Sequence, residues 1–269
     1  MYRIFDIHTH IYPDEISEKA VVNLGKFYNF IPEGKGTETD MCSDAKSFGV
    51  GGFLVFSVAT NAHQVPKVNN FIAALVERER VCGFEAVGFG GMHQDFENME
   101  AEVDRMIALG LRGIKLHPDI QKVDIDDPRL MRLYEAAEGR LPVYFHIGDG
   151  RPEYRFSESQ KLAKVLDCFP KLEVVAAHLG GYQAWEDGIR NLAGRENVWY
   201  DTSSALWATT PEYASAVIKR LGTDRVMFGT DYPVMRIAHE FERFMRLHLT
   251  EIERADILWN NAARFLKLS

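Results

Sequence analysis

Residues 2–10 read YRIFDIHTH, an apolar run that ends in two histidines one residue apart. Short runs of this kind, rich in β-branched and aromatic residues, recur along the whole chain. Eight are found: YRIFDIHTH (2–10), GGFLVFSV (51–58), VCGFEAVGF (81–89), RGIKLHP (112–118), PVYFHIG (142–148), EVVAAHLG (173–180), VWYDTSS (198–204) and RVMFGTDYP (225–233). Because they are almost continuously apolar, the runs predict parallel strands that are buried on both faces.

Amphipathic stretches alternate with these runs, and several begin at Asp, Ser or Thr, which suit a helix N-cap. Examples are FENMEAEVDRMIALG (96–110), DPRLMRLYEAAE (127–138), SESQKLAKVLDCF (157–169) and TPEYASAVIKRLG (210–222). Eight strands, each followed by a helix, predict a single (β/α)₈ TIM barrel over residues 1–269. The alternative is a doubly wound open sheet, which would normally carry GxGxxG or GxxxxGKS after its first strand, and neither motif occurs.

The regular spacing is broken once, between residues 12 and 40, where several aromatics and the segment EGKGTET separate the first strand from its helix. Long loops after barrel strands lie over the active-site end, so residues 12–40 are a candidate lid insertion. An ordinary surface insertion is the alternative.

Composition excludes several classes of function. The chain has 31 Lys and Arg against 39 Asp and Glu, a formal net charge of -8, which argues against nucleic acid or an anionic membrane as partner. Its three cysteines form no CxxC pair, so neither a disulfide framework nor a thiolate zinc site is expected. No signal-peptide pattern is visible, and we expect a cytoplasmic enzyme that acts on a small molecule.

Polar side chains end five of the eight predicted strands. They are His8 and His10 on the first, Lys115 on the fourth, His146 on the fifth, His178 on the sixth and Asp231 on the eighth. A parallel barrel brings these strand ends together at the end where catalytic sites form. Four histidines and one aspartate converging there predict a metal site, although any one of them alone could be a hydrogen-bonded structural residue.

The expected donors are nitrogen and oxygen only, a set that suits Zn²⁺ and also admits Mn²⁺, Fe²⁺, Co²⁺ or Ni²⁺. The sequence does not choose among these metals or between one ion and two. Because the site lies at a barrel mouth and lacks thiolates, we expect a catalytic ion with an open position for water.

At these residues the chain resembles a known family. His-x-His on the first strand, Lys in GIKLHP, His in VYFHIG, His in VAAHLGG and Asp in FGTDYP are similar to the amidohydrolase superfamily. The segments YDTSS and ILWNNAARFL, together with HLGG and RVMFGTDYP, resemble its branch that contains aminocarboxymuconate-semialdehyde decarboxylase. The resemblance runs from the first strand to the last helix.

This resemblance implies roles for individual residues. His8, His10, His146 and Asp231 would bind the principal metal, and His178 would be a catalytic acid or base, or a ligand of a second ion. Lys115 would be a ligand only if it is carboxylated, as in dihydroorotase-like relatives. The family also implies a tendency toward homodimers.

Three functions follow from the same residues. Our main expectation is a hydrolase in which a metal-activated water attacks a small amide, lactone or ester, with Asp231 and His178 as catalytic residues. The alternative is a non-oxidative decarboxylase of a small, aromatic carboxylic acid, in which Asp231 or His178 protonates the carbon that loses CO₂. A catalytically inactive barrel is disfavoured because every expected metal position holds a competent residue.

Substrate contacts are harder to predict. A carboxylated aromatic substrate favours cations and aromatics in the loops after the strands, where the candidates are Arg151, Arg155, Trp207, Arg236 and His117. For each of them, a solvated loop charge or a packing residue is the alternative.

Overall fold

The computed structural model describes residues 2–81 and 84–268. Within these residues the strand segments are β1 (Ile4–His10), β2 (Val50–Phe56), β3 (Glu85–Gly88), β4 (Gly90–Gly91), β5 (Ile114–Leu116), β6 (Val143–Phe145), β7 (Val174–Ala176), β8 (Val198–Asp201) and β9 (Val226–Met227). All pairings are parallel, and the strands pair in chain order as β1–β2–β3 and β4 through β9. This is the order that the predicted barrel requires.

Backbone hydrogen bonds close the ring between the first and last strands. The amide of Ile7 donates to the carbonyl of Phe228 at 2.9 Å, and the amide of His10 donates to that of Tyr232 at 2.6 Å. Thr9 and Tyr232 also form a parallel bridge. The polar end of β1 therefore lies directly beside the segment that carries Asp231.

The third predicted strand, residues 81–89, differs from the structure in two ways. Residue 81 is the last residue of a helix rather than the start of a strand, and residues 82–83 lie outside the described part of the chain. The remainder divides into β3 and β4 on either side of Phe89, which is buried and donates its amide hydrogen to the carbonyl of Val55. Together the two segments fill one place in the barrel wall.

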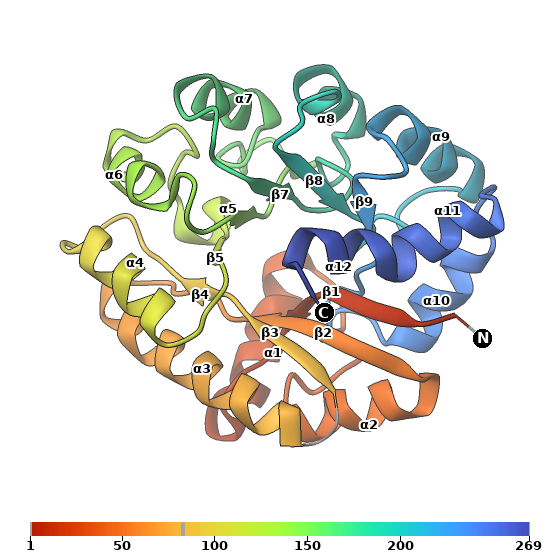
Figure 1. The fold of residues 1–269 in the computed structure, drawn as a ribbon, viewed down its shortest axis with the longest axis horizontal. Coiled ribbons are helices and arrows are strands. Elements are labelled where there is room, and N and C mark those ends of the chain that lie inside the picture. The colour runs from red at the N-terminus through yellow and green to blue at the C-terminus, as the bar shows by residue number, and fades with distance from the viewer. Residues whose placement is uncertain (1, 82–83, 269) are drawn as a thin grey trace.

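Helices surround the strands in Figure 1. They are α1 (Asp14–Tyr28), α2 (Glu38–Phe48), α3 (Val65–Val81), α4 (Met99–Ala108), α5 (Pro118–Gln121), α6 (Pro128–Ala137), α7 (Ser159–Cys168), α8 (Trp185–Leu192), α9 (Pro211–Leu221), α10 (Ile237–Met245), α11 (Glu251–Ala255) and α12 (Asn261–Leu266), with short η1 (Ala62–Gln64) and η2 (Asp256–Asn260) turns. Local sequence sets several of their starts: the side chains of Thr37, Asp127 and Thr210 accept hydrogen bonds from the first turns of α2, α6 and α9.

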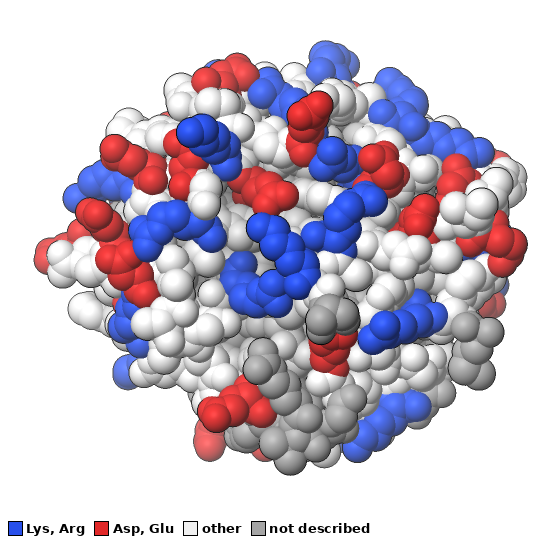
Figure 2. Space-filling view, in the orientation of Figure 1, with Lys and Arg blue, Asp and Glu red and all other residues white. Residues whose placement is uncertain are grey.

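The core has two parts. One fills the space between the strands and the outer helices, and the other fills the inside of the barrel with residues such as Phe5, Phe56 and Tyr144. Phe265 of α12 belongs to the inner part, so α12 plugs the end of the barrel that carries the strand starts. Figure 2 shows the face bearing both chain ends, where Lys and Arg side chains gather near the centre. The polar ends of the strands therefore lie at the opposite end of the barrel.

The 12–40 insertion forms α1 and the start of α2. Backbone hydrogen bonds from Glu33 and Gly34 to Val234 and Pro233 join its loop to the segment after Asp231. The insertion is therefore attached to the strand-end side of the barrel, as expected for a candidate lid. No helix in the described part of the chain is long and apolar enough to cross a membrane.

Candidate metal centre

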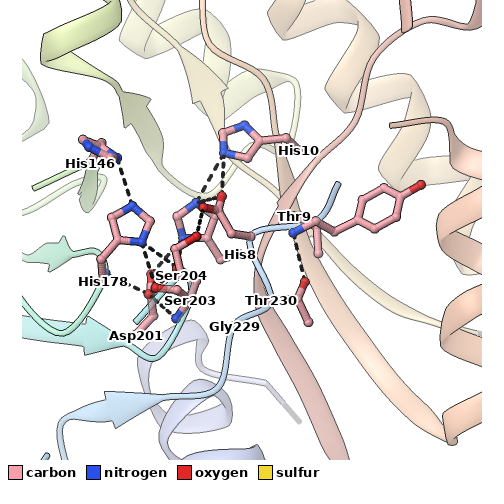
Figure 3. Close-up of polar contacts among 12 residues, drawn as sticks. His8, Thr9, His10, His146, His178, Asp201, Ser203, Ser204, Gly229 and Thr230 are labelled. Carbon is pink, nitrogen blue, oxygen red and sulfur yellow. Dashed lines mark hydrogen bonds and ion pairs between the residues drawn. The ribbon is translucent and has the colours of Figure 1, made fainter. Parts of the chain in front are cut away.

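The six residues predicted to form the metal site meet at one end of the barrel. His8 and His10 end β1, Lys115 lies on β5, and His146, His178 and Asp231 follow β6, β7 and β9. Figure 3 shows the four histidines turned toward one another above the strand ends. Tertiary structure thus brings together residues that are up to 223 positions apart, as His8 and Asp231 are.

One group of donors is formed by His8, His10 and Asp231. The Nε2 atom of His8 lies 3.1 Å from Oδ1 of Asp231 and 3.3 Å from Nε2 of His10, while His10 Nε2 lies 3.5 Å from the same carboxylate oxygen. These three atoms face a common point, and such a group is close enough to share one ion. Ser204 donates a hydrogen bond to the other oxygen of Asp231 at 2.6 Å, which fixes the carboxylate.

The hydrogen-bond partners of His8 decide which of its nitrogens carries hydrogen. Its Nδ1 lies 2.9 Å from Oδ2 of Asp201, an acceptor with no hydrogen of its own when ionised. Nδ1 is therefore the protonated nitrogen, and the lone pair of Nε2 points toward His10 and Asp231. A carboxylate that orients a histidine in this way is the usual support of a metal ligand.

His178 and His146 are polarised by backbone carbonyls. His178 Nδ1 lies 2.9 Å from the carbonyl oxygen of Ser203, and His146 Nε2 lies 3.0 Å from that of Gly148. Carbonyl oxygens only accept, so both nitrogens must donate. This leaves lone pairs on His178 Nε2 and His146 Nδ1, which face each other at 2.9 Å. Two lone pairs at this separation require a cation or a shared proton between or beside them.

Burial keeps most of these imidazoles neutral. It lowers the pKa of His10 to about 4, and it also lowers the pKa of His178 and, strongly, that of His146. Burial alone would raise the pKa of Asp231, but its contacts with the His8 and His10 imidazoles outweigh this effect and hold the pKa well below its usual value. Neutral imidazoles beside an ionised carboxylate are the protonation states that metal binding requires.

These observations fit a divalent cation. The site offers imidazole lone pairs and one carboxylate, with no thiolate, and each of the described lone pairs of His8, His146 and His178 is fixed by a hydrogen bond on the other nitrogen. That donor set suits Zn²⁺ and Mn²⁺ alike.

Lys115 is fully buried beside this group. Its Nζ lies 3.4 Å from His8 Nε2 and packs over the faces of Phe56 and Tyr144, at 4.6 and 4.4 Å from the ring centroids. Burial lowers its pKa to about 8. Among the described residues no carboxylate forms an ion pair with Lys115 within 4.0 Å. The carboxylation of Lys115 stays a prediction.

Asp201 and Ser203 are structural parts of the site that the sequence prediction missed. Asp201 accepts hydrogen bonds from Tyr144, from the backbone amide of His178 at 3.0 Å and from Ser203 Oγ at 2.6 Å. Burial raises the pKa of Asp201, yet the neighbouring His8 lowers it far below the usual value. The sequence pattern could have identified Asp201, because it ends β8 just as polar residues end the neighbouring strands.

The backbone is strained at two of the predicted catalytic residues. His178 and Asp231 have φ values of 61° and 62°, in the left-handed region that few residues other than glycine adopt. Each such residue costs on the order of 1–3 kcal/mol, and residues of this kind concentrate at functional sites.

A cavity of about 740 Å³ opens onto these donors. His8, His10, Lys115, His146, His178 and Asp231 line its inner end. Its walls include seven Phe, Tyr and Trp side chains: Tyr12, Phe27, Tyr28, Phe30, Phe71, Tyr182 and Trp207. Several of these belong to α1 and the residues around it, so the predicted lid insertion forms one wall of the cavity.

The predicted substrate residues divide into two groups. Trp207 and His117 line the cavity. Arg151, Arg155 and Arg236 are not among the lining residues, so their predicted substrate contact is not supported by the structure. Each arginine is held by acidic partners instead: Asp149 for Arg151, Glu158 for Arg155, and Asp40 and Asp44 for Arg236. These ion pairs satisfy the cations outside the cavity.

Comparison with known proteins gives the family. Residues 5–268 match the amidohydrolase family. A gamma-resorcylate decarboxylase from Polaromonas sp. is 27% identical over 260 residues, covering 78% of each chain. Among solved structures, an uncharacterized TIM-barrel protein from Bordetella bronchiseptica is 21% identical, covers 98% of each chain and superposes with a TM-score of 0.79.

A second solved structure is relevant to the metal. The dihydroxybenzoic acid decarboxylase of Polaromonas sp. JS666, with bound manganese and the inhibitor 2-nitroresorcinol, is 16% identical, covers 100% of this chain and 98% of that one, and has a TM-score of 0.74. The predicted TIM barrel is thereby confirmed, and so is the resemblance that the strand-end residues carried. The chain belongs to the amidohydrolase family.

Proposed function

We propose that this protein is a metal-dependent, non-oxidative decarboxylase of small aromatic acids that carry a hydroxyl group. The observation that carries the proposal is its similarity to a gamma-resorcylate decarboxylase over 78% of both chains. The lining of the cavity agrees with it, because aromatic side chains line the same cavity as the cluster of histidines and Asp231. A flat, apolar ring with polar substituents at one edge fits such a space.

Hydrolysis was the main expectation from the sequence, and decarboxylation was the alternative. The relatives favour the alternative, since the similar proteins of named activity are carboxy-lyases. The residues themselves do not discriminate, because both reactions use the same metal-binding and proton-transferring groups.

His8, His10, His146 and Asp231 would hold the cation, and we propose Mn²⁺ as the physiological metal, with Zn²⁺ as the second candidate. A similar fold holds manganese, and the mixed nitrogen and oxygen donors accept it. When bound, the ion supplies positive charge that orients the substrate's oxygens and stabilises negative charge developing on them.

The chain's own part in the reaction is proton transfer. Decarboxylation breaks the bond between the ring and the carboxylate carbon, and the electron pair stays on the ring carbon, which then needs one proton. Asp231 is ionised in the resting site, so it accepts the proton of the substrate's hydroxyl and then delivers that proton to the ring carbon. CO₂ leaves, and the phenolate product takes a proton from water on release.

His178 lies in the same site and can take part in this proton transfer. Its Nε2 lone pair is fixed by the bond from Nδ1 to the carbonyl of Ser203, so it accepts a hydrogen bond or proton at a defined position. We propose that it assists proton movement between the substrate and Asp231.

The experiment that separates the two reactions measures CO₂ directly. Protein loaded with Mn²⁺ is incubated with 2,6-dihydroxybenzoate and 2-hydroxybenzoate, and in parallel with aryl esters, lactones and amides. Release of CO₂ with formation of the matching phenol supports the decarboxylase. Hydrolysis of an ester, lactone or amide without CO₂ release from any acid would favour the hydrolase instead.

Assembly as a homodimer and a cytoplasmic location stay predictions. Sedimentation velocity at micromolar concentration tests the first.

A further inference from the structure

Tyr28 brings a hydroxyl group from the insertion into the site. It is the last residue of α1 and lines the cavity, far in sequence from the strand ends. Its Oη lies 2.8 Å from Nε2 of His117 and 3.4 Å from Nε2 of His146. The insertion therefore supplies a polar group next to a predicted metal ligand.

His117 fixes the direction of the hydrogen bond to Tyr28. Its Nδ1 accepts a hydrogen bond from the backbone amide of Ile120 at 3.3 Å, which caps α5. The hydrogen of the neutral ring is therefore on Nε2, and this N–H donates to the oxygen of Tyr28. The ring is also held in place by stacking on His146, with centroids 4.0 Å apart and planes 10° apart.

The hydrogen of the Tyr28 hydroxyl has no acceptor among the described residues. The other close nitrogen, Nε2 of His146, donates to the carbonyl of Gly148 and has no lone pair to offer. Tyr28 thus accepts a hydrogen bond from the protein and keeps its own O–H free at the cavity surface. A buried or half-buried donor of this kind calls for an acceptor, and a bound ligand can provide it.

Arg151 holds the end of α1 in this position. Its guanidinium makes two bonds to Asp149, at 2.9 and 2.7 Å, and it donates a further bond to the carbonyl of Phe27. The same group packs over the rings of Phe27, Tyr28 and Tyr154, at 4.7, 5.3 and 4.0 Å from their centroids. Asp149 and Arg151 follow His146 by three and five residues, so the loop that carries a predicted ligand also anchors Tyr28.

We propose that Tyr28 is a substrate-binding residue, whose hydroxyl donates a hydrogen bond to the carboxylate of the aromatic acid. This assignment rests on the proposed function. The carboxylate is the favoured acceptor because a hydrogen bond to an ionised oxygen is stronger than one to a neutral oxygen. His117 and Arg151 then act through Tyr28 as positioning residues.

Tyr28→Phe tests the assignment, with Tyr154→Phe as its matched control. Tyr154 packs against Phe27 in the same aromatic group but does not line the cavity. Binding of benzoate, which lacks the hydroxyl group that the proposed reaction needs, and of resorcinol, which lacks the carboxylate, is measured by calorimetry on Mn²⁺-loaded protein. Tyr28→Phe should weaken binding of the acid about 10- to 100-fold and that of resorcinol less than about threefold. Tyr154→Phe should change neither.

The role of His117 is tested by His117→Asn. The asparagine oxygen can still cap α5, but the side chain lacks the Nε2 donor that polarises Tyr28. It should weaken acid binding selectively, and the double variant with Tyr28→Phe should be no weaker than Tyr28→Phe alone. Additive losses that affect resorcinol equally would assign His117 a purely structural role.

The outcomes distinguish this assignment from the proposed reaction. Equal effects of Tyr28→Phe on the acid and on resorcinol, or no effect on either, overturn the assignment. Failure of the wild-type protein to bind benzoate, 2-hydroxybenzoate or 2,6-dihydroxybenzoate overturns it too. Carboxylate binding that depends on Tyr28 without any CO₂ release supports the assignment and overturns the decarboxylase.

Discussion

Asp201 accepts a hydrogen bond from Nδ1 of His8 over 2.9 Å, and both side chains are buried at the centre of the site. Through the amide of His178 and the side chain of Ser203, the same carboxylate also positions the strand end that carries His178. One aspartate therefore sets the orientation of donors from β1 and the loop after β7.

Asp201→Asn should weaken metal binding by about 10- to 100-fold, because the amide can present its NH₂ group to His8 and favour the wrong tautomer. Competitive titration with a chelating dye measures the affinity. Glu102→Gln is the control, since Glu102 is a buried, hydrogen-bonded acid on α4. Unchanged metal affinity in Asp201→Asn would remove this residue from its supporting role.

Asp231→Asn should lower the rate of CO₂ release by about 10²–10⁴-fold, because the amide cannot carry the proton to the ring carbon. Metal content is measured in the same sample to separate lost chemistry from lost metal. Ser204→Ala removes only the 2.6 Å bond to Oδ2 and should cost less than about tenfold. Near wild-type turnover in Asp231→Asn would show that another group transfers the proton.

Removal of the metal should lower thermal stability, because the ion binds the folded chain far better than the unfolded chain. With free metal at about 100 times its Kd, the expected stabilisation is about 2.7 kcal/mol, or roughly 5–10 °C in Tm. Scanning calorimetry before and after treatment with a chelator measures the shift. His10→Ala should lose most of this response, and a shift of wild-type size in that variant would place the ion elsewhere.

Stability should fall as the pH rises from about 5 to 8, in part because of Glu240. This side chain of α10 is fully buried, and burial raises its pKa to about 8 despite its 2.8 Å ion pair with Arg243. In the unfolded chain this carboxyl has the ordinary glutamate pKa of 4.5, so between pH 4.5 and about 8 the native state binds more protons than the unfolded state.

Glu240→Gln removes that titration and should therefore increase stability at pH 8.5 by on the order of 1–3 kcal/mol, with little change at pH 5. Urea unfolding at the two pH values measures the difference. Glu242→Gln, an exposed change on the same helix, should have no effect at either pH. A gain in Glu240→Gln that is equal at both pH values would contradict this role.

Much of the fold could be predicted because a strand that is buried on both faces needs apolar residues at consecutive positions, and such runs are visible in the sequence. Runs such as EVVAAHLG are apolar at consecutive positions, and β7 within it is fully buried. Helix starts were visible at Asp127 and Thr210 because their caps are local interactions. The third strand was less clear, since its predicted start at Val81 is the last residue of α3. Periodicity does not separate the start of a short strand from the end of a helix.

The candidate site was predictable where a residue's position on its strand determines its direction. His8, His146 and Asp231 converge because the barrel brings equivalent strand ends together. The sequence could not show that Arg155 and Arg236 pair with acidic residues instead of facing the cavity. Their partners Glu158 and Asp40 are determined by loop packing and not by strand geometry. Tyr28 was missed for the same reason, as it reaches the site from a helix of the insertion.

The central claim is that four donors from three strand ends hold one catalytic ion, and anomalous diffraction from crystals of Mn²⁺-loaded protein tests it most directly. We predict a single manganese peak within about 2–2.5 Å of His8 Nε2, His10 Nε2, His146 Nδ1 and a carboxylate oxygen of Asp231. A fully active protein whose manganese lies away from His8, His10 and Asp231, for example among His117, Asp119 and His146, would contradict the account.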